Sequence, residues 1–304
     1  MSDRKILVTG ASGKLGQQVV SYLLNDFDVK PNQLIVTTRN VESLAELADK
    51  GVDVREADFS SPDALEQAFH GAHSMLLISI DASGPRTQAH LNAVTAAEKA
   101  GVTHIAYTSM LAPTQSPVVF AHEHEATEQA ILDSAIPNAT VMQNNWYFDN
   151  LPDYYASILQ TGHWLSAAGE GRIAQLSRKD LAYAAAAAVV KGNQSKGLHQ
   201  SKVTLPMHGA EALTHAEMAK VIDSVIGTSI NMVHLSDEEY QAQLESFGLP
   251  APIVSLCTTM DHHNRLGLSN GTSDVFEALT GKKPQSFESW LEENKAELQK
   301  LANM

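Results

Sequence analysis

The chain has 304 residues, of which 43% are hydrophobic, and a formal net charge of −14. This length allows a large buried core and favours a domain of ordinary size with a smaller second lobe. The negative charge would repel nucleic acids and anionic membranes, and no apolar run is long enough to span a bilayer, so neither is an expected partner.

Cysteine content and the N-terminus bear on the cellular compartment. The single cysteine, Cys257, excludes an intramolecular disulfide and is typical of a reducing environment. The sequence enters an apolar strand at once, so we expect no signal peptide. We therefore expect a cytoplasmic protein.

The first predicted element is a buried strand over residues 6–8, a short apolar run without alternation. Glycines at a spacing of three follow it, Gly10-x-x-Gly13-x-x-Gly16, and apolar residues then recur at helical spacing. This order forms a phosphate cradle, because a helix N-terminus offers free N–H groups and the positive end of its dipole. A mononucleotide P-loop is excluded, since Val8 stands where that motif needs glycine and Leu15 where it needs serine or threonine. The pattern predicts a dinucleotide site, with a structural turn as the alternative.

Strands and helices are predicted to alternate after this loop. Further strands are expected at residues 33–37, 52–55, 75–78, 104–108 and near 140–142. Helices are expected at residues 41–50, from Ser61-Pro62 onward, at 86–100 and at 121–134. Regular alternation with short connections predicts an α/β fold, a Rossmann-type doubly wound parallel sheet over residues 1–150.

Residues 151–304 predict a smaller, mainly helical substrate lobe, partly interleaved with the first domain. Ser177 and Asp180 form an expected capping box before an alanine-rich helix at 182–190, and so many alanines indicate close packing. Two more capping boxes are expected before amphipathic stretches, Thr214 with Glu217 and Ser236 with Glu239.

The end of the second strand indicates which nicotinamide cofactor would bind. An acidic residue there usually holds the ribose 2′-hydroxyl of NADH. This sequence has Thr37-Thr38-Arg39-Asn40 instead, and Arg39 can hold a 2′-phosphate, with Lys14 adding positive charge. We therefore expect NADPH; the alternative is that Arg39 is a solvated residue beside a helix cap. Asp58 is either an adenine contact or simply an aspartate at a helix start.

A catalytic pair common in short-chain reductases is missing from the sequence. Carbonyl-reducing members use a tyrosine with a lysine four residues later, and none of the seven tyrosines has one. Reduction of a ketone needs a positioned proton donor for the developing alkoxide. Reduction of a quinone spreads the charge over a conjugated ring, so the donor matters less. The sequence favours an electron-poor acceptor such as a quinone.

Several of these motifs together are similar to one family. They are the loop at residues 8–16, Arg39-Asn40, residues 105–109, Glu123-His124 with Thr127-Glu128, residues 144–147, and residues 167–169 with Gly171, Ile173, Arg178 and Asp180. The chain resembles the NmrA-like branch of the atypical short-chain dehydrogenase/reductases, and within it the bacterial NAD(P)H:quinone oxidoreductases of type 2 and the triphenylmethane reductases. It departs from them at Gln143, where arginine is expected, and at Lys14, where glutamine is frequent.

The resemblance implies NADPH-dependent hydride transfer to quinone-type acceptors, without flavin, in a cleft between the lobes. The residues expected to contact the cofactor are Gly10, Ser12, Gly13, Lys14, Leu15, Gly16, Arg39, Asp58, Ser79, Thr108 and Asn144. A non-enzymatic NAD(P) sensor that partners a regulatory protein is the competing function. A homodimer is possible, but the sequence does not determine the oligomeric state.

Candidate catalytic and substrate residues follow the fifth and sixth strands. Trp146 and Tyr147 come after the sixth strand, where flat rings could line a planar acceptor or pack between lobes, and Tyr147 is also a candidate catalytic residue. His124 is expected to act as a proton donor or to form a buried structural pair with Glu128, four residues later on the same helix face. No metal site is expected: His122-Glu123-His124 lacks the required spacing, and Asp261-His262-His263 is expected at the surface.

Overall fold

The computed structural model describes residues 4–80, 86–150, 157–194 and 201–303. Contacts divide the chain into two compact units. The first consists of Met1–Met110, His122–Asn144 and Leu181–Pro206, and the second of Leu111–Ala121, Asn145–Asp180 and Met207–Met304. The expected division into a domain of residues 1–150 and a lobe of residues 151–304 stays a prediction.

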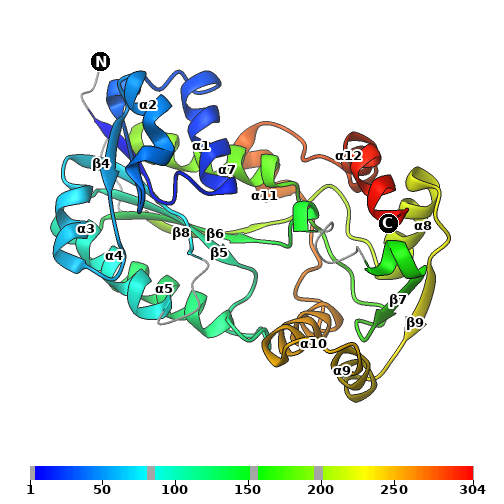
Figure 1. The fold of residues 1–304 in the computed structure, drawn as a ribbon. Coiled ribbons are helices and arrows are strands. Elements are labelled where there is room, and N and C mark those ends of the chain that lie inside the picture. The colour runs from blue at the N-terminus through cyan, green and yellow to red at the C-terminus, as the bar shows by residue number, and fades with distance from the viewer. Residues whose placement is uncertain (1–3, 81–85, 151–156, 195–200, 304) are drawn as a thin grey trace. The chain divides into compact units, whose positions relative to one another are not determined.

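The first unit is built on a seven-stranded sheet (Figure 1) with the strand order β3-β2-β1-β4-β5-β6-β8. Its strands are β1 (Lys5–Val8), β2 (Leu34–Thr38), β3 (Asp53–Glu56), β4 (Ala72–Leu77), β5 (His104–Met110), β6 (Asn138–Asn144) and β8 (Ser201–Met207). Every pairing from β3 through to β6 is parallel. The order reverses between β1 and β4, and ligands of open α/β sheets bind at the carboxyl ends of strands at such a switch point. The predicted Rossmann-type fold is confirmed.

Helices cover both faces of this sheet (Figure 1). Those on one face are α1 (Lys14–Asn25), α2 (Ala45–Asp49) and α7 (Arg178–Gln194), and those on the other are α3 (Pro62–Phe69), α4 (Arg86–Lys99) and α5 (Ala121–Asp133). The helix expected at residues 41–50 is wrong in its first turn, which is the 3-10 helix η2 (Val41–Leu44). Asn40 caps that turn as expected, because its side chain accepts a hydrogen bond from the Glu42 N–H.

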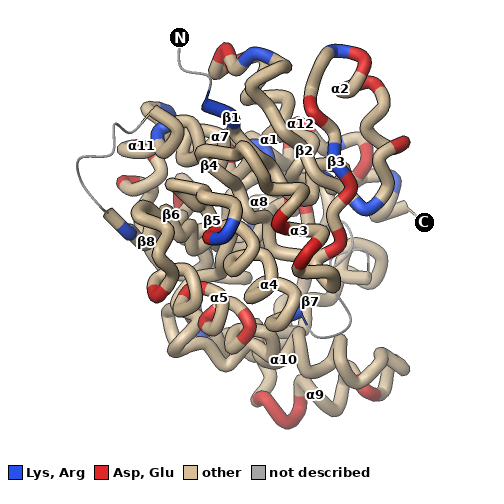
Figure 2. The backbone as a smooth tube through the Cα atoms, turned by 90° about the vertical axis from the view of Figure 1, so that its left-hand side faces the viewer, with Lys and Arg blue, Asp and Glu red and all other residues tan. Residues whose placement is uncertain are grey.

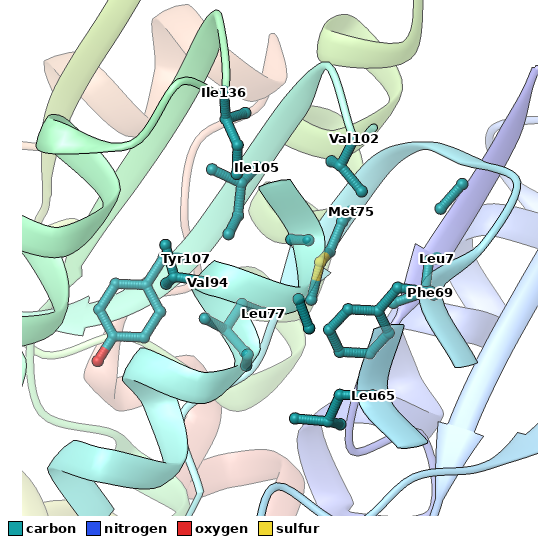
Figure 3. Packing of buried hydrophobic residues seen from close by; sticks show 14 of the residues in the cluster. Leu7, Leu65, Phe69, Met75, Leu77, Val94, Val102, Ile105, Tyr107 and Ile136 are labelled. Atoms are coloured by element: carbon teal, nitrogen blue, oxygen red, sulfur yellow. The ribbon is translucent and has the colours of Figure 1, made fainter. Parts of the chain in front are cut away.

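The core beneath α3 and α4 is formed by alternate residues of the central strands, as Figure 3 shows. Leu7, Met75 and Ile105 are fully buried and pack with Leu65 and Phe69 of α3. Fully burying a side chain of this size stabilises the fold by about 1.5–3 kcal/mol. This packing fixes the positions of β1, β4 and β5, and so of the polar residues at their carboxyl ends.

The alanine-rich helix packs closely against the sheet, as predicted. Ala184, Ala185 and Ala186 of α7 are fully buried. The Ser74 hydroxyl in β4 donates to the Val189 carbonyl at 2.9 Å and also bonds with Nδ1 of His104 at 2.8 Å. Small side chains are therefore required on this face of α7.

The second unit combines two parallel strands, β7 (His163–Ser166) and β9 (Asn231–His234), with several helices. The helices are η3 (Phe148–Asn150), α8 (His215–Ile226), α9 (Asp237–Ser246), α10 (Ala251–Arg265), α11 (Asp274–Thr280) and α12 (Phe287–Ala302). The predicted capping boxes of α8 and α9 are confirmed. The strands β7, β8 and β9 were not predicted, because their segments lack a continuous apolar run.

The segment Asp261-His262-His263 was expected at the surface, and this is wrong for two of its residues. Asp261 and His263 are at most 2% exposed. The Asp261 carboxylate accepts hydrogen bonds from the Ala167 N–H and the Ser166 hydroxyl, while His263 bonds with the Ser116 hydroxyl. These partners lie far along the chain, so the pattern of α10 alone could not predict the burial.

Charged residues are distributed over many elements. Figure 2 shows acidic residues on α3, α5 and α9, among other elements, and basic residues interspersed with the acidic ones along the backbone. Within the described ranges, no helix combines the length and the apolar character needed to cross a membrane.

Gly192 in α7 offers a test of this packing. Replacing an exposed helical glycine with alanine usually stabilises a protein by about 1 kcal/mol. Here the added Cβ would lie 2.0 Å from Nδ1 of His104, whose ring is held by Ser74 and Thr140. We expect Gly192→Ala to destabilise the protein by about 1–3 kcal/mol in urea unfolding. The control, Gln194→Ala at an exposed position of the same helix, should change stability little; a stabilised Gly192→Ala would contradict the packing.

Candidate functional site

The glycine loop joins β1 to α1 at the carboxyl edge of the sheet. Gly10 has a φ of +60°, which favours glycine. A Cβ at position 16 would lie 2.2 Å from the Gly10 carbonyl oxygen, so only glycine lets α1 begin this close to the loop. Gly13 occupies the cap position and has no side chain to occupy the first-turn N–H groups of α1. The loop therefore has the backbone geometry expected of a phosphate cradle, with Lys14 exposed and Leu15 half-buried at the start of α1.

The loop is tied to the end of β2. The Ala11 N–H donates to the Thr37 carbonyl at 3.1 Å, and the hydroxyls of Ser12 and Thr38 are 3.0 Å apart. Arg39 follows at once and is exposed. The Ser60 N–H and, more weakly, the nearby charge of Arg39 lower the pKa of the Asp58 carboxyl. Arg39 and Asp58 thus neighbour each other at the edge where the sequence predicted them.

Polar residues also gather at the ends of β4, β5 and β6. The Ser79 N–H donates to the Thr108 hydroxyl at 2.9 Å, and this hydroxyl donates to the Ser79 hydroxyl at 3.3 Å. Asn144 ends β6, opposite Met110 of β5, and is 6% exposed. The structure brings the predicted cofactor residues of the first unit to one edge of one sheet.

A buried network begins at Tyr107, one residue before Thr108. The Tyr107 hydroxyl lies 2.8 Å from Nδ1 of His124, and Nε2 of His124 lies 2.8 Å from the Arg86 guanidinium. A guanidinium can only donate, so Nε2 accepts and the His124 proton is on Nδ1. Arg86 also pairs with Glu123 at 3.3 Å. Burial and the charge of Arg86 lower the pKa of His124 to about 3, so this histidine is neutral near pH 7.

His124 and Glu128 do not form the pair expected from their spacing. The Glu128 carboxylate accepts a hydrogen bond from the Ser109 hydroxyl at 2.5 Å and others from the Gln143 amide at 3.0 and 3.1 Å. Ser109 and Gln143 are register partners on β5 and β6, so both face the same part of α5. Burial raises the pKa of Glu128 despite these bonds. A neutral amide at position 143 thus meets this carboxylate where an arginine was expected.

Trp146 and Tyr147 belong to the second unit. The indole N–H of Trp146 donates to Asn264 Oδ1 and to the Ser269 hydroxyl, each at 3.1 Å, and its ring meets His263 edge-on. Tyr147 is half-buried and forms an isolated bridge with Leu176. These contacts fix the Trp146 ring within its own unit.

The residues at the edge of the sheet fit a dinucleotide. The close approach at Gly16, the cap glycine and the positive φ at Gly10 leave backbone N–H groups where a pyrophosphate would need them. Arg39 supplies a cation at the position that an acidic residue occupies in NADH-specific sites. Among the described residues, no group of three or more His, Cys, Asp or Glu side chains could hold a metal ion.

Comparison with known proteins identifies the family. A sequence model described as the NmrA-like family matches residues 2–291. The chain belongs to the NmrA-like family. One relative of this NmrA-like protein is quinone oxidoreductase 2 of Escherichia coli, 36% identical over 266 residues, which are 88% of either chain. Another is the NAD(P)H azoreductase of Xenophilus azovorans, 26% identical over 286 residues, covering 93% of this chain and 95% of the relative.

Two solved structures share this NmrA-like fold over nearly the full length. The E. coli NADPH-dependent quinone oxidoreductase QOR2, complexed with NADPH, has a TM-score of 0.85 and 33% identity, covering 96% of this chain and 99% of its own. The triphenylmethane reductase of a Citrobacter species, complexed with NADP(H), has a TM-score of 0.83 and 31% identity, covering 96% and 100%. The resemblance inferred from the motifs is confirmed.

Sequence reasoning missed several polar residues beneath the site of this NmrA-like chain. Thr9, Arg86, His90 and Tyr107 are buried and hydrogen-bonded next to the candidate residues. Thr9 and Tyr107 adjoin predicted site residues in sequence, which was a usable signal. Nothing in the local pattern of α4 marked Arg86 or His90, because their partners lie on other elements.

The buried neutral state of His124 predicts acid sensitivity. Its folded pKa of about 3 lies below the ordinary 6.5, so the unfolded chain binds more protons between these values. The free energy of unfolding is therefore not reduced by His124 above pH 6.5, and it falls as the pH drops from 6.5 towards 3, because the unfolded chain takes up a proton there that the folded His124 does not. Between pH 6.5 and 5 this residue should account for about 2 kcal/mol of the loss.

We expect His124→Gln, which keeps an acceptor for Arg86 but does not titrate, to show a shallower fall of unfolding free energy with pH. Urea unfolding at several pH values measures it. Parallel curves for the variant and the unmodified protein would show that His124 titrates normally.

Proposed function

We propose that this protein transfers hydride from NADPH to quinone-type acceptors, without flavin and without a Tyr–Lys pair. The observation that carries the proposal is its likeness, over nearly the whole of both chains, to a quinone oxidoreductase whose crystal structure contains NADPH. Relatives named as oxidoreductases and an azoreductase favour an enzyme over a non-enzymatic sensor. The direct test is steady NADPH oxidation with a small quinone, followed by the absorbance of the reduced nicotinamide.

The chain's own residues would bind and orient the cofactor. NADPH, when bound, supplies the hydride. The glycine loop and the first turn of α1 would hold the pyrophosphate, with Ser12, Lys14 and Leu15 beside it. Arg39 would hold the 2′-phosphate and Asp58 would contact the adenine. Ser79, Thr108 and Asn144 would complete the cofactor edge at the ends of β4, β5 and β6.

For the acceptor, we propose that Trp146 and Tyr147 line a pocket for a planar ring. The catalytic role expected of His124 is proposed in a modified form, as a positioning residue. Both of its ring nitrogens have partners within 2.8 Å, it is 4% exposed, and its lowered pKa keeps it neutral. These properties support a role in which His124 holds Tyr107 and Arg86 in place, and they argue against His124 as a proton donor.

We also propose that the protein works in the cytoplasm, on the basis of its single cysteine, the buried Cys257. A homodimer stays a prediction, which sedimentation of the purified chain would measure.

Cofactor choice can be tested at Arg39. Replacing it with alanine should weaken NADPH binding about tenfold to a hundredfold and leave NADH binding nearly unchanged, because only NADPH offers a 2′-phosphate to the guanidinium. Titration of both cofactors measures this. Lys50→Ala is the control, since it removes the same charge at the end of α2, away from the carboxyl edge. Equal losses for both cofactors would contradict the assignment of Arg39.

Acceptor choice can be tested by comparing one quinone with one activated ketone. A ketone that accepts hydride concentrates negative charge on one oxygen, which needs a donor within hydrogen-bond reach. We expect robust turnover with the quinone and little with the ketone, and His124→Gln should leave quinone turnover largely intact across pH. Ketone reduction that disappears in this variant would instead make His124 the acid.

A further inference from the structure

The three residues after β4 have an unusual set of hydrogen bonds. Their consecutive backbone N–H groups all donate to side chains rather than to a neighbouring strand. Ile78 donates to the Thr9 hydroxyl at 2.9 Å, Ser79 to the Thr108 hydroxyl at 2.9 Å, and Ile80 to Nε2 of His90 at 3.1 Å. The acceptors come from three elements, the end of β1, β5 and α4. We call residues 78–80 the β4 extension.

The β4 extension lies against the glycine loop. A Cβ at Gly10 would be 3.8 Å from the Cβ of Ile78, which is van der Waals contact. Thr9, directly before Gly10, also donates its backbone N–H and its hydroxyl to the Leu76 carbonyl, at 3.0 and 3.2 Å. The glycine loop and the β4 extension are therefore positioned by the same side chain.

His90 is the acceptor that α4 contributes, and it is completely buried. Because its Nε2 accepts from the Ile80 N–H, its proton must be on Nδ1. That nitrogen lies 3.1 Å from the Thr127 hydroxyl, which donates to the Glu123 carbonyl at 2.7 Å and so can accept from His90. Burial lowers the pKa of His90 to about 4, in keeping with a neutral ring. Each nitrogen of His90 thus has one fixed role: Nε2 accepts from Ile80, and Nδ1 donates to Thr127.

We propose that His90 is a positioning residue for the cofactor: with Thr9 and Thr108 it fixes the β4 extension, so that Ser79 is held at a constant distance from the glycine loop. The inference rests on the proposed function, since it assumes NADPH at this edge. A strand end without these acceptors would donate its N–H groups to water and sample several conformations. Hydride transfer depends strongly on a fixed geometry, and a displacement of about 1 Å can cost about a hundredfold in rate.

A pair of substitutions separates positioning from simple packing. In His90→Gln the side-chain carbonyl reaches the place of Nε2 and can accept from the Ile80 N–H. In His90→Asn the side chain is one methylene shorter and reaches only the place of Nδ1, beside Thr127. Both variants lose the ring, so both should lose thermal stability to a similar degree. Only the asparagine variant loses the bond to the β4 extension.

The measurements are amide hydrogen exchange of residues 78–80, NADPH titration and steady-state kinetics with a quinone. In His90→Asn we expect faster exchange of the Ile80 amide and NADPH binding about three- to tenfold weaker, the equivalent of one hydrogen bond. In His90→Gln both should remain close to the unmodified protein. His104→Asn is the control for general destabilisation, because His104 is a buried, hydrogen-bonded histidine at the opposite end of β5.

The outcomes distinguish this inference from the proposed function. If the unmodified protein binds NADPH but the two His90 variants match each other in exchange and affinity, the positioning role is overturned and the function stands. The positioning role is also overturned if His104→Asn weakens NADPH binding as much as His90→Asn does. If the unmodified protein does not bind NADPH, the proposed function fails, while the exchange rates still report whether His90 holds the β4 extension.

Discussion

The site depends on the close approach of α1 to the glycine loop. The Gly10 carbonyl lies where a side chain at position 16 would begin, so the helix can start there only if that side chain is absent. This contact places the N-terminus of α1, with its first-turn N–H groups and positive dipole end, at the switch point of the sheet. The loop is then tied to β2 through Ala11 and to β4 through Thr9. A single steric constraint thus positions the backbone that would receive a pyrophosphate.

In the first unit, buried histidines serve as hydrogen-bonding parts of the structure. His90, His104 and His124 each bond through both ring nitrogens to groups on other elements, and burial lowers the pKa of each. A neutral imidazole offers one donor and one acceptor in fixed directions, so it can join two elements without a buried charge. The buried cation Arg86, which bonds with His124, is compensated by Glu123. Near pH 7 these three histidines are therefore neutral and act as fixed links between elements.

Local sequence patterns predicted much of the fold. The apolar runs, the cap residues and the glycines defined six parallel strands and their helices, because each depends on residues within a few positions of each other. The strands β7, β8 and β9 were missed, since pairing with distant segments decides them. The helix expected at residues 41–50 was wrong only in its first turn, which is the 3-10 helix η2. The His124–Glu128 pair was predicted from helix spacing alone, and it failed because Ser109 and Gln143, adjacent across β5 and β6, reach Glu128.

By itself, the sequence determined the glycine loop before α1, the cation at Arg39 and the missing Tyr–Lys pair, because each is a matter of residue type at short spacing. Only the tertiary structure decided which polar side chains meet behind the glycine loop. Thr9, His90 and Thr108 lie far apart along the chain, and all three bond to residues 78–80. Parallel strands bring Thr9 and Thr108 to one edge of the sheet, and the packing of α4 brings His90 there. Buried hydrogen bonds between distant elements leave no periodic signal in the sequence, so this part of the site follows from the fold.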